Sequence, residues 1–152
     1  MSANTRMTLA VHVLTWIAFD RCGSDNEIGT SQRIATSVNT NPVVIRRCLG
    51  ELREAGIVES SRTHGWALSY AASDITLRDV YRAVGGGVFA MHASPPDHAC
   101  LVGYGIQPVL VRAYERATTA LCDSLAQTTI ADILRDTLAE AQAHAGAELQ
   151  HA

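Results

Sequence analysis

The chain contains no lysine, so all 12 of its basic residues are arginines. Only 18% of its residues are charged and 47% are hydrophobic, a balance that excludes intrinsically disordered and fibrous chains. No apolar run approaches the roughly 18–20 residues that a membrane-spanning helix requires. The first residues lack the basic start and apolar stretch of a signal peptide. A chain of 152 residues fits one ordinary globular domain, and we expect a protein of the cytoplasm.

The four cysteines are widely spaced, and no two of them form a C-x-x-C pair; they are Cys22, Cys48, Cys100 and Cys122. A zinc ribbon or a thioredoxin-type dithiol would require such a pair. A disulfide scaffold is typical of small secreted domains that cannot bury a large core. We therefore expect free thiols in a reducing compartment, with Cys22 and Cys48 acting as small packing residues.

Sequence motifs of catalysis are also missing. The chain has no nucleophile elbow, no Walker loop and no zinc-hydrolase motif. Gly103-Tyr104-Gly105 follows no strand pattern and is too short to indicate a nucleotide site. The sequence therefore predicts no catalytic residue, and we do not expect an enzyme.

The charges are distributed unevenly along the chain. Through Arg82 there are 9 arginines and 8 acidic residues, and after it there are 3 arginines and 7 acidic residues. The two parts carry formal charges of +1 and −4, which give the net charge of −3. A net acidic chain is not an obvious nucleic-acid binder, but its arginines are concentrated in the first part.

Apolar periodicity predicts two helices at the start of the chain. The first covers Thr8–Arg21 and ends in a turn-rich stretch, Cys22–Asn26. Its apolar face consists of Leu9, Val13, Trp16 and Ile17. The second covers Ser31–Val38, with Thr30 or Ser31 as its N-cap.

The third helix has strong boundary signals, because Asn41 suits an N-cap, Pro42 suits the first helical position and Gly56 suits the left-handed closing position. An apolar stripe inside it consists of Ile45, Leu49, Leu52 and Ala55. At about 100° per residue, the opposite face presents Val43, Arg46, Arg47, Gly50 and Glu54 to solvent.

A hairpin and a short helix complete the first part. Residues 57–61 read as one strand, and the alternation of Trp66, Leu68 and Tyr70 predicts a second, joined by a turn over 62–65. A helix then runs to about Val84, with Asp74 or Thr76 as its cap.

The second part begins with a loop over 92–100, whose paired prolines exclude a helix or a central strand. A long helix is expected from Ile106 to Leu125, with Pro108 in its first turn. Its apolar stripe consists of Ile106, Leu110, Ala113, Ala117, Leu121 and Leu125. A capping box at Thr129–Asp132 opens a last helix, which we expect to fray from Gly146. The predicted units are 1–84, 85–104, 105–145 and a tail at 146–152.

Helix, helix-turn-helix and hairpin in this order are typical of a winged helix-turn-helix domain that binds double-stranded DNA. The candidate contacts are Ser31, Gln32, Asn41, Val43, Arg46, Arg47 and, at the hairpin tip, Arg62. Arginine can make a paired contact to guanine, and valine can meet the methyl group of thymine. Alternatively, Arg46 and Arg47 are part of a solvated helix face and pair with Glu51 and Glu54.

The run IATSVNTNPVVIRRCLGELREAGIVES, followed after the hairpin by DITLRDVYRAVGG, resembles the Rrf-type winged-helix transcriptional regulators. That family includes the iron–sulfur cluster regulator, the nitric-oxide-sensing repressor and the cysteine-metabolism repressor. The resemblance covers about residues 7–140. It implies a mainly helical fold with a small β-hairpin and a homodimeric, usually repressing, regulator. It also implies dimerisation through the helix around Ile106–Leu125.

This sequence departs from the family pattern in two places. The glycine-rich wing tip is reduced to Arg62-Thr63-His64-Gly65-Trp66, although Arg62 keeps its place. Members that bind a cluster carry three cysteines in the loop before the long helix, whereas this loop holds Cys100 alone. Since a cluster requires several thiolates, we expect no iron–sulfur cofactor and no metal.

Three interpretations of the loop stay open: a thiol switch at Cys100, a metal site formed by Cys100 with His98 and His92, or a loop cysteine without function. The effector is unknown. A different class of function is also open, since a winged helix can serve as a protein-interaction module.

Overall fold

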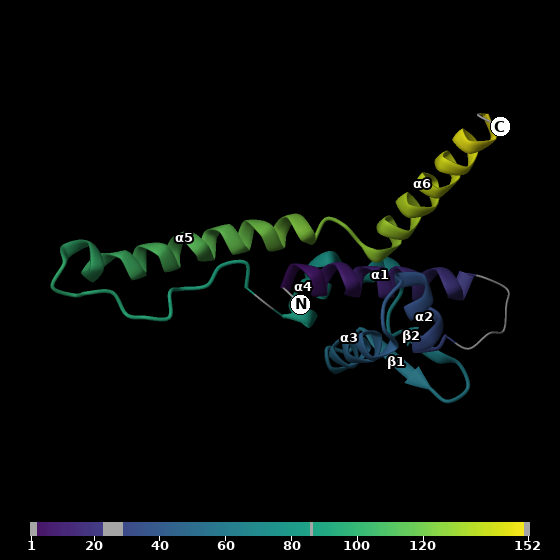
Figure 1. Ribbon diagram of the computed structural model, residues 1–152, viewed down its shortest axis with the longest axis horizontal. Coiled ribbons are helices and arrows are strands. Elements are labelled where there is room, and N and C mark those ends of the chain that lie inside the picture. Colours follow the sequence, from purple (N-terminus) through teal and green to yellow (C-terminus); the bar gives the residue numbers. More distant parts are fainter. Residues whose placement is uncertain (1–2, 23–28, 86, 151–152) are drawn as a thin grey trace.

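The computed structural model describes residues 3–22, 29–85 and 87–150. Its elements are α1 (Ala3–Cys22), α2 (Ser31–Val38), α3 (Pro42–Glu54), β1 (Val58–Ser61), β2 (Gly65–Leu68), the 3-10 helix η1 (Ala72–Asp74), α4 (Leu77–Val84), α5 (Leu101–Leu125) and α6 (Ile130–Gln150). Helix α1 runs through the middle, α3 and the hairpin lie on one side of it, and α5 extends away as a long arm (Figure 1). The predicted fold, mainly helical with a small hairpin, is confirmed.

The core forms around α1, whose Val13, Leu14 and Ile17 side chains are almost fully buried. They belong to one cluster with side chains from α2, α3, α4 and β1, and with Ile130 at the start of α6. The first helix begins at Ala3, so the predicted start at Thr8 is wrong. Its additional turn is held by tertiary contacts, because Arg6 donates a hydrogen bond to Glu51 of α3 and Met7 packs against the core. The predicted turn at Cys22–Asn26 falls mainly on residues 23–28, outside the described residues.

The predicted caps of α2 and α3 are confirmed. The Thr30 hydroxyl accepts a hydrogen bond from the Arg33 amide, and the Asn41 side chain accepts one from the Val43 amide at 2.8 Å. Gly56 follows α3 with φ of +74°, in the left-handed region that favours glycine. Ala55 is exposed, so its predicted place in the apolar stripe is wrong, because the helix ends one residue before it.

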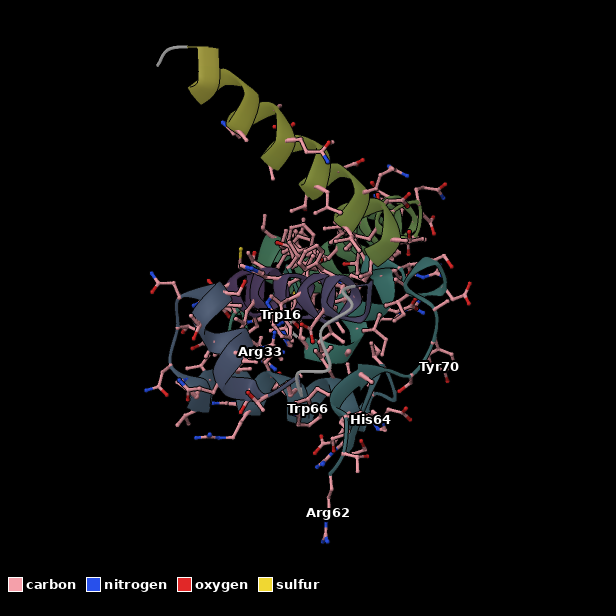
Figure 2. The ribbon with its side chains drawn as sticks, turned by 90° about the vertical axis from the view of Figure 1, so that its right-hand side faces the viewer. Trp16, Arg33, Arg62, His64, Trp66 and Tyr70 are labelled. Atoms are coloured by element: carbon pink, nitrogen blue, oxygen red, sulfur yellow. The ribbon has the colours of Figure 1, made fainter. Side chains whose placement is uncertain are left out.

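The two strands pair antiparallel from Val58–Leu68 at the base to Ser61–Gly65 at the tip. Strand β2 ends at Leu68, and Tyr70 lies beyond it with 63% of its surface exposed (Figure 2). The predicted alternation is therefore wrong at its end. Ala67 and Leu68 are both buried, so burial does not alternate along this short strand. Leu68 belongs to the core cluster.

Two capping boxes fix the starts of α4 and α6. In the first, Thr76 and Asp79 bond reciprocally, and in the second Thr129 and Asp132 do the same. The two starts also pair through the backbone, since the Leu77 amide donates to Thr128 and the Ile130 amide donates to Ile75, both at 2.9 Å. Helix α6 is therefore tied to the end of the winged-helix unit.

Helix α5 begins at Leu101, so the predicted start at Ile106 is wrong and the connecting segment ends at Cys100. The early start depends on Gly103, because a Cβ there would collide with the carbonyl oxygen of Asp97. The sequence does not predict this start, because the low helix propensity of Gly103 and Gly105 disfavours a helix there.

Pro108 lies in the interior of α5 rather than in its first turn. The carbonyl of Tyr104 therefore has no amide donor four residues later. At the other end of the chain, α6 continues to Gln150, past the predicted fraying point at Gly146, because this stretch is rich in strong helix formers.

The described residues cover the predicted apolar stripe of α5 only in part: no residue of this helix is buried, and Ile106 and Leu110 line a cleft with the segment before the helix. Ile106 is 37% exposed, and its neighbours Val109 and Val111 are more exposed still. Within the described ranges, no helix is long and apolar enough to cross a bilayer.

Candidate nucleic-acid interface

The first half of α3 presents a solvent-facing set of side chains. Asn41, Val43 and Arg46 are all exposed, and 60% of the Val43 surface is accessible. Ile45, Cys48 and other inward residues hold the opposite face against the core. The predicted division of α3 into an inner and an outer face is thus confirmed at these positions. The carbonyl oxygen of the Asn41 side chain is used for the cap, and its amide group remains free to donate.

Arg46 and Arg47 have different surroundings. Arg47 lies 3.5 Å from Glu51 one turn later, and Glu51 also bonds Arg6 of α1 at 2.8 Å. Arg46 makes no ion pair or hydrogen bond to any described residue. The alternative of a paired helix face therefore applies to Arg47 alone, through Glu51 and not Glu54.

Arg62 lies at the tip of the hairpin and points away from the rest of the molecule (Figure 2). The turn is braced locally, because the His64 amide donates to the Ser61 hydroxyl at 2.9 Å and Gly65 adopts φ of +67°. The exposed Thr63 hydroxyl lies 2.9 Å from the His64 ring. The wing is short, but it is an ordered turn that projects one guanidinium.

Strand β2 of the hairpin is anchored, close to the tip, to the helix-turn-helix pair. The Trp66 amide donates to the Gly29 carbonyl at 3.0 Å, and the Arg53 guanidinium of α3 lies 6.0 Å from the Trp66 ring. These contacts set the position of Arg62 relative to α3. Helical and strand periodicity do not predict these contacts, although Trp66 at a strand start and Arg53 at a helix end are visible in the sequence.

A second brace connects α2 to α1. Arg33 lies 5.2 Å from the centre of the Trp16 ring and 3.1 Å from an Asp20 carboxylate oxygen (Figure 2). Of the two candidate residues at the start of α2, Gln32 is exposed and Ser31 is half-buried. The brace holds this end of α2 in a fixed orientation on the core.

The candidate sensor residues lie around the start of α5. Cys100 is exposed and is the N-cap residue of this helix. Hydrogen bonds from the Gly103 and Val102 amides lower the pKa of its thiol. His98 meets the Tyr104 ring edge-on, while His92 accepts a hydrogen bond from the Ser94 amide.

These three residues do not form a metal site. Across residues 3–22, 29–85 and 87–150, no three His, Cys, Asp or Glu side chains come together in a group that could hold a metal ion. Cys48 is buried and burial raises its pKa to about 12, with Glu51 adding to the shift. The interpretation of Cys48 as a packing residue is consistent with this environment.

A helix-turn-helix with an exposed second helix and a projecting hairpin defines the class of winged helix-turn-helix proteins. A family model described as Rrf2, iron-dependent transcriptional regulator, matches residues 3–136. The chain is 37% identical over 134 residues to the HTH-type transcriptional regulator YwnA of Bacillus subtilis, across 86% of this chain and 96% of that protein. The chain therefore belongs to the Rrf2 family of DNA-binding transcriptional regulators.

Solved structures agree with this assignment. A crystal structure described as a DNA-binding protein superposes with a TM-score of 0.69 at 35% identity, covering 85% of this chain and 98% of its own. IscR of T. potens superposes with a TM-score of 0.62 at 20% identity, covering 88% of this chain and 85% of its own. The predicted family and the predicted winged-helix fold are thus confirmed.

The iron in the family description raises the question of whether this chain could hold it. An iron–sulfur cluster takes several thiolates, and the segment before α5 supplies only Cys100. The other described cysteines do not help, since Cys48 is buried inside α3 and Cys122 lies near the far end of α5. The residues present therefore do not fit a cluster bound by one chain.

Proposed function

We propose that this protein is a homodimeric repressor that binds a roughly palindromic operator through α3 and the wing. The observation that carries the proposal is the pair of free guanidiniums, Arg46 on α3 and Arg62 at the wing tip. Both are exposed and neither is paired with a described residue. The protein would act in the cytoplasm without an iron–sulfur cluster.

Helix α3 would enter the major groove with its N-terminal half. There Arg46 can donate two hydrogen bonds to one guanine, and Val43 can contact a thymine methyl group. Arg47 is shared with Glu51 and would reach a phosphate at the edge of the groove. Gln32 and Ser31 at the start of α2, together with Asn41, would add contacts to the backbone.

Arg62 would contact the flanking minor groove or its phosphates. A single guanidinium on a short turn suits a narrow groove, whose negative potential attracts arginine. Non-specific affinity for DNA depends on the number of phosphates that a protein neutralises. Because the chain has only 12 basic residues and a net charge of −3, its affinity for an operator would depend on a few directed contacts.

The homodimer is supported by the apolar stripe of α5, which is exposed or half-buried along its length. Pairing two copies through this stripe would bury Ile106, Leu110 and Leu121, and would place two winged-helix units at the ends of one assembly. The two-fold symmetry of such a dimer predicts two half-sites about one helical turn apart, or a multiple of that distance.

The test begins with selection of bound duplexes from a random library, followed by fluorescence anisotropy on the selected site. Arg46→Ala is expected to lose about 1–3 kcal/mol of binding free energy at particular base pairs and to relax selectivity there. Arg62→Ala is expected to weaken binding to all sequences more evenly. It should also reduce the slope of log affinity against log salt concentration by about one.

Arg112→Ala is the matched control, because it removes one exposed arginine from α5, outside the proposed interface. It should bind the selected duplex like wild type. Equal losses on every sequence for Arg46→Ala and Arg62→Ala would remove the base-reading role of Arg46. If the selection enriches no duplex, the proposed function is overturned.

A redox-gated regulator is the second candidate, because Cys100 is exposed and its pKa is lowered. Oxidation of this thiol at the start of α5 would change the contacts of the segment that joins α4 to α5. Duplex selection in the presence and absence of peroxide tests it, with Cys100→Ser as the variant that should abolish any difference.

A further inference from the structure

A cleft of about 540 Å³ lies between α4 and α5, and the segment after α4 closes one side of it. Its volume lies within the range of small-molecule sites. Its lining includes Arg78, Arg82, Phe89, Tyr114, Glu115 and Asp123. The sequence analysis did not single out this set, although Arg78 and Arg82 are spaced one turn apart on a short helix.

The α4 wall of the cleft is cationic. Arg78 and Arg82 lie at i and i+4, so both guanidiniums project from one face of the helix. The Nε atom of Arg78 is buried and has no hydrogen-bond partner among the described residues. Buried donors are nearly always paired, so this N–H group can donate a hydrogen bond to a ligand oxygen. Asp79 is near enough for the charges of Arg78 and Arg82 to lower its pKa, but no hydrogen bond joins its carboxylate to Arg78, and Thr76 bonds its Oδ2 atom.

The α5 wall is anionic and hydroxylated. Glu115 and Asp123 both line the cleft, and Thr118 and Thr119 lie between them. In the part of the chain that the structure describes, neither carboxylate forms an ion pair with Arg78 or Arg82. Two charges of each sign therefore face each other across the cleft without being paired.

The third side of the cleft is apolar. Phe89 stacks on Tyr114 with ring centres 4.6 Å apart and planes inclined by 8°. Met91 and Val111 extend this surface. An aromatic and aliphatic wall of this kind accommodates an apolar side chain.

Most of this cleft lies outside the proposed dimer surface. At about 100° per residue, Glu115 and Cys122 project roughly opposite to Ile106 and Ala117 around α5. Tyr114 projects in the direction of Leu121 and Leu125, so the two surfaces share an edge there, while the charged lining of the cleft stays open to solvent when two copies pair.

We propose that the cleft binds a small zwitterion, an α-amino acid with an apolar side chain. Its carboxylate would accept hydrogen bonds from Arg78 and Arg82, and its ammonium group would lie against Glu115 or Asp123. A simple anion would meet the two carboxylates, and a simple cation would meet the two arginines. Only a ligand with both charges satisfies both walls while its side chain lies on the Phe89–Tyr114 pair.

Occupancy would also fix α4 relative to α5, because the ligand bridges them. Residues 85 and 87–100 otherwise join these helices without a helix or strand in the described positions. This regulatory use rests on the proposed DNA-binding function, whereas ligand binding itself does not. The two are therefore measured separately.

Isothermal titration calorimetry on the full chain without DNA tests the site. The probes are L-phenylalanine, L-leucine and L-methionine, each compared with its N-acetyl form, which lacks the ammonium group, and its amide, which lacks the carboxylate. At least one free amino acid should bind saturably, and both blocked forms should bind about tenfold more weakly or worse. If none of the three binds up to about 10 mM, or if either blocked form binds as well as its parent, the proposal is overturned.

Variants locate the site. Arg78→Gln and Glu115→Gln should each weaken binding of the successful probe about tenfold, while Arg112→Gln, an exposed residue of α5 that does not line the cleft, should leave its affinity unchanged. Equal binding by all three variants would place the ligand elsewhere and overturn the assignment. Circular dichroism confirms that each variant is folded, and the blocked-ligand comparison on wild type stands even where one is not.

Operator binding is then measured by anisotropy with and without the successful probe. An unchanged operator affinity would contradict regulation of DNA binding by the ligand, but it would not affect the assignment of the ligand-binding site. A chain that binds no duplex but binds the probe would contradict the proposed function and leave the ligand site intact.

Discussion

Glu51 joins two arginines with different roles. It accepts a hydrogen bond from Arg6 of α1 at 2.8 Å and lies 3.5 Å from Arg47 on its own helix. Its carboxylate is about one quarter exposed, so it is screened less than a surface acid. In this position Glu51 holds α1 on α3, and in the proposed complex it would compete with a DNA phosphate for Arg47.

Glu51→Gln should therefore tighten operator binding a few-fold and steepen its salt dependence, because it frees Arg47 and removes a negative charge near the DNA. It should also cost about 1 kcal/mol of stability through the lost bond to Arg6. Anisotropy across a salt series and urea denaturation measure the two effects. Glu54→Gln removes an exposed acid from the same helix, and identical behaviour of the two variants would contradict the role of Glu51.

The cysteines should differ sharply in reactivity. The lowered pKa of Cys100 yields more thiolate at a given pH than an ordinary cysteine, and its side chain is exposed. Burial holds Cys48 as the neutral thiol. Alkylation by iodoacetamide between about pH 6 and 9, followed by mass spectrometry, should modify Cys100 first and Cys48 only after unfolding. Faster modification of Cys48 than of Cys100 in the folded protein would contradict these environments.

At the scale of elements, the capping box of α4 is the feature most open to measurement. Burial raises the pKa of Asp79, but the hydrogen bonds from Thr76 and the nearby Arg78 and Arg82 outweigh it and lower the pKa overall. A carboxylate with a lowered pKa stabilises the fold above its unfolded pKa, near 3.8, and this contribution is lost as the pH falls through the folded pKa.

Asp79→Asn should cost about 1 kcal/mol at neutral pH, or about 3 °C in Tm, because the amide accepts more weakly from the Thr76 amide and hydroxyl. The difference from wild type should shrink as the pH falls below about 4 and vanish only below the lowered pKa of the folded state. Thermal unfolding followed by circular dichroism over this pH range provides the measurement. Asp74→Asn, a nearby exposed substitution outside the box, should behave like wild type throughout, and a pH-independent loss in Asp79→Asn would contradict the mechanism.

The elements that the sequence predicted correctly are those with local signals. Thr30, Asn41 and the Thr129–Asp132 box each specify a helix start through side-chain bonds within three residues. The predicted start of α5 failed because local propensity near Pro108 disfavours a helix, whereas the actual start depends on the close approach of Asp97 to Gly103.

In the candidate interface, too, the features with local sequence signals were predictable and the contacts between distant residues were not. The exposed face of α3 follows from helical periodicity, and Arg62 follows from its place in a turn. The contacts that orient them do not, because Arg33 with Trp16, and Arg53 with Trp66, join residues that are distant in the sequence. Apolar periodicity reports which face is buried, but not which side chains meet across elements.

For the whole molecule, the unusual feature is a long helical arm that the described part of the chain covers only in part. Helix α5 extends away from the winged-helix body (Figure 1) and buries none of its residues. Leu101, Val102 and Val109 are more than half exposed along it. Since most helical stability in proteins comes from packing an apolar face, a helix of 25 residues in this position requires a partner surface.

Leu110→Glu tests whether that partner is a second copy. In a symmetric dimer the substitution occurs twice, so the interface loses two buried leucines and gains two like charges. At about 2 kcal/mol for each leucine, dimerisation should weaken by about 4 kcal/mol, close to a thousandfold. Analytical ultracentrifugation should then show a monomer, and operator affinity should fall because each half-site binds alone. Arg112→Glu places the same carboxylate on another face of α5 and should remain dimeric; if Leu110→Glu is also dimeric, the apolar stripe is not the interface.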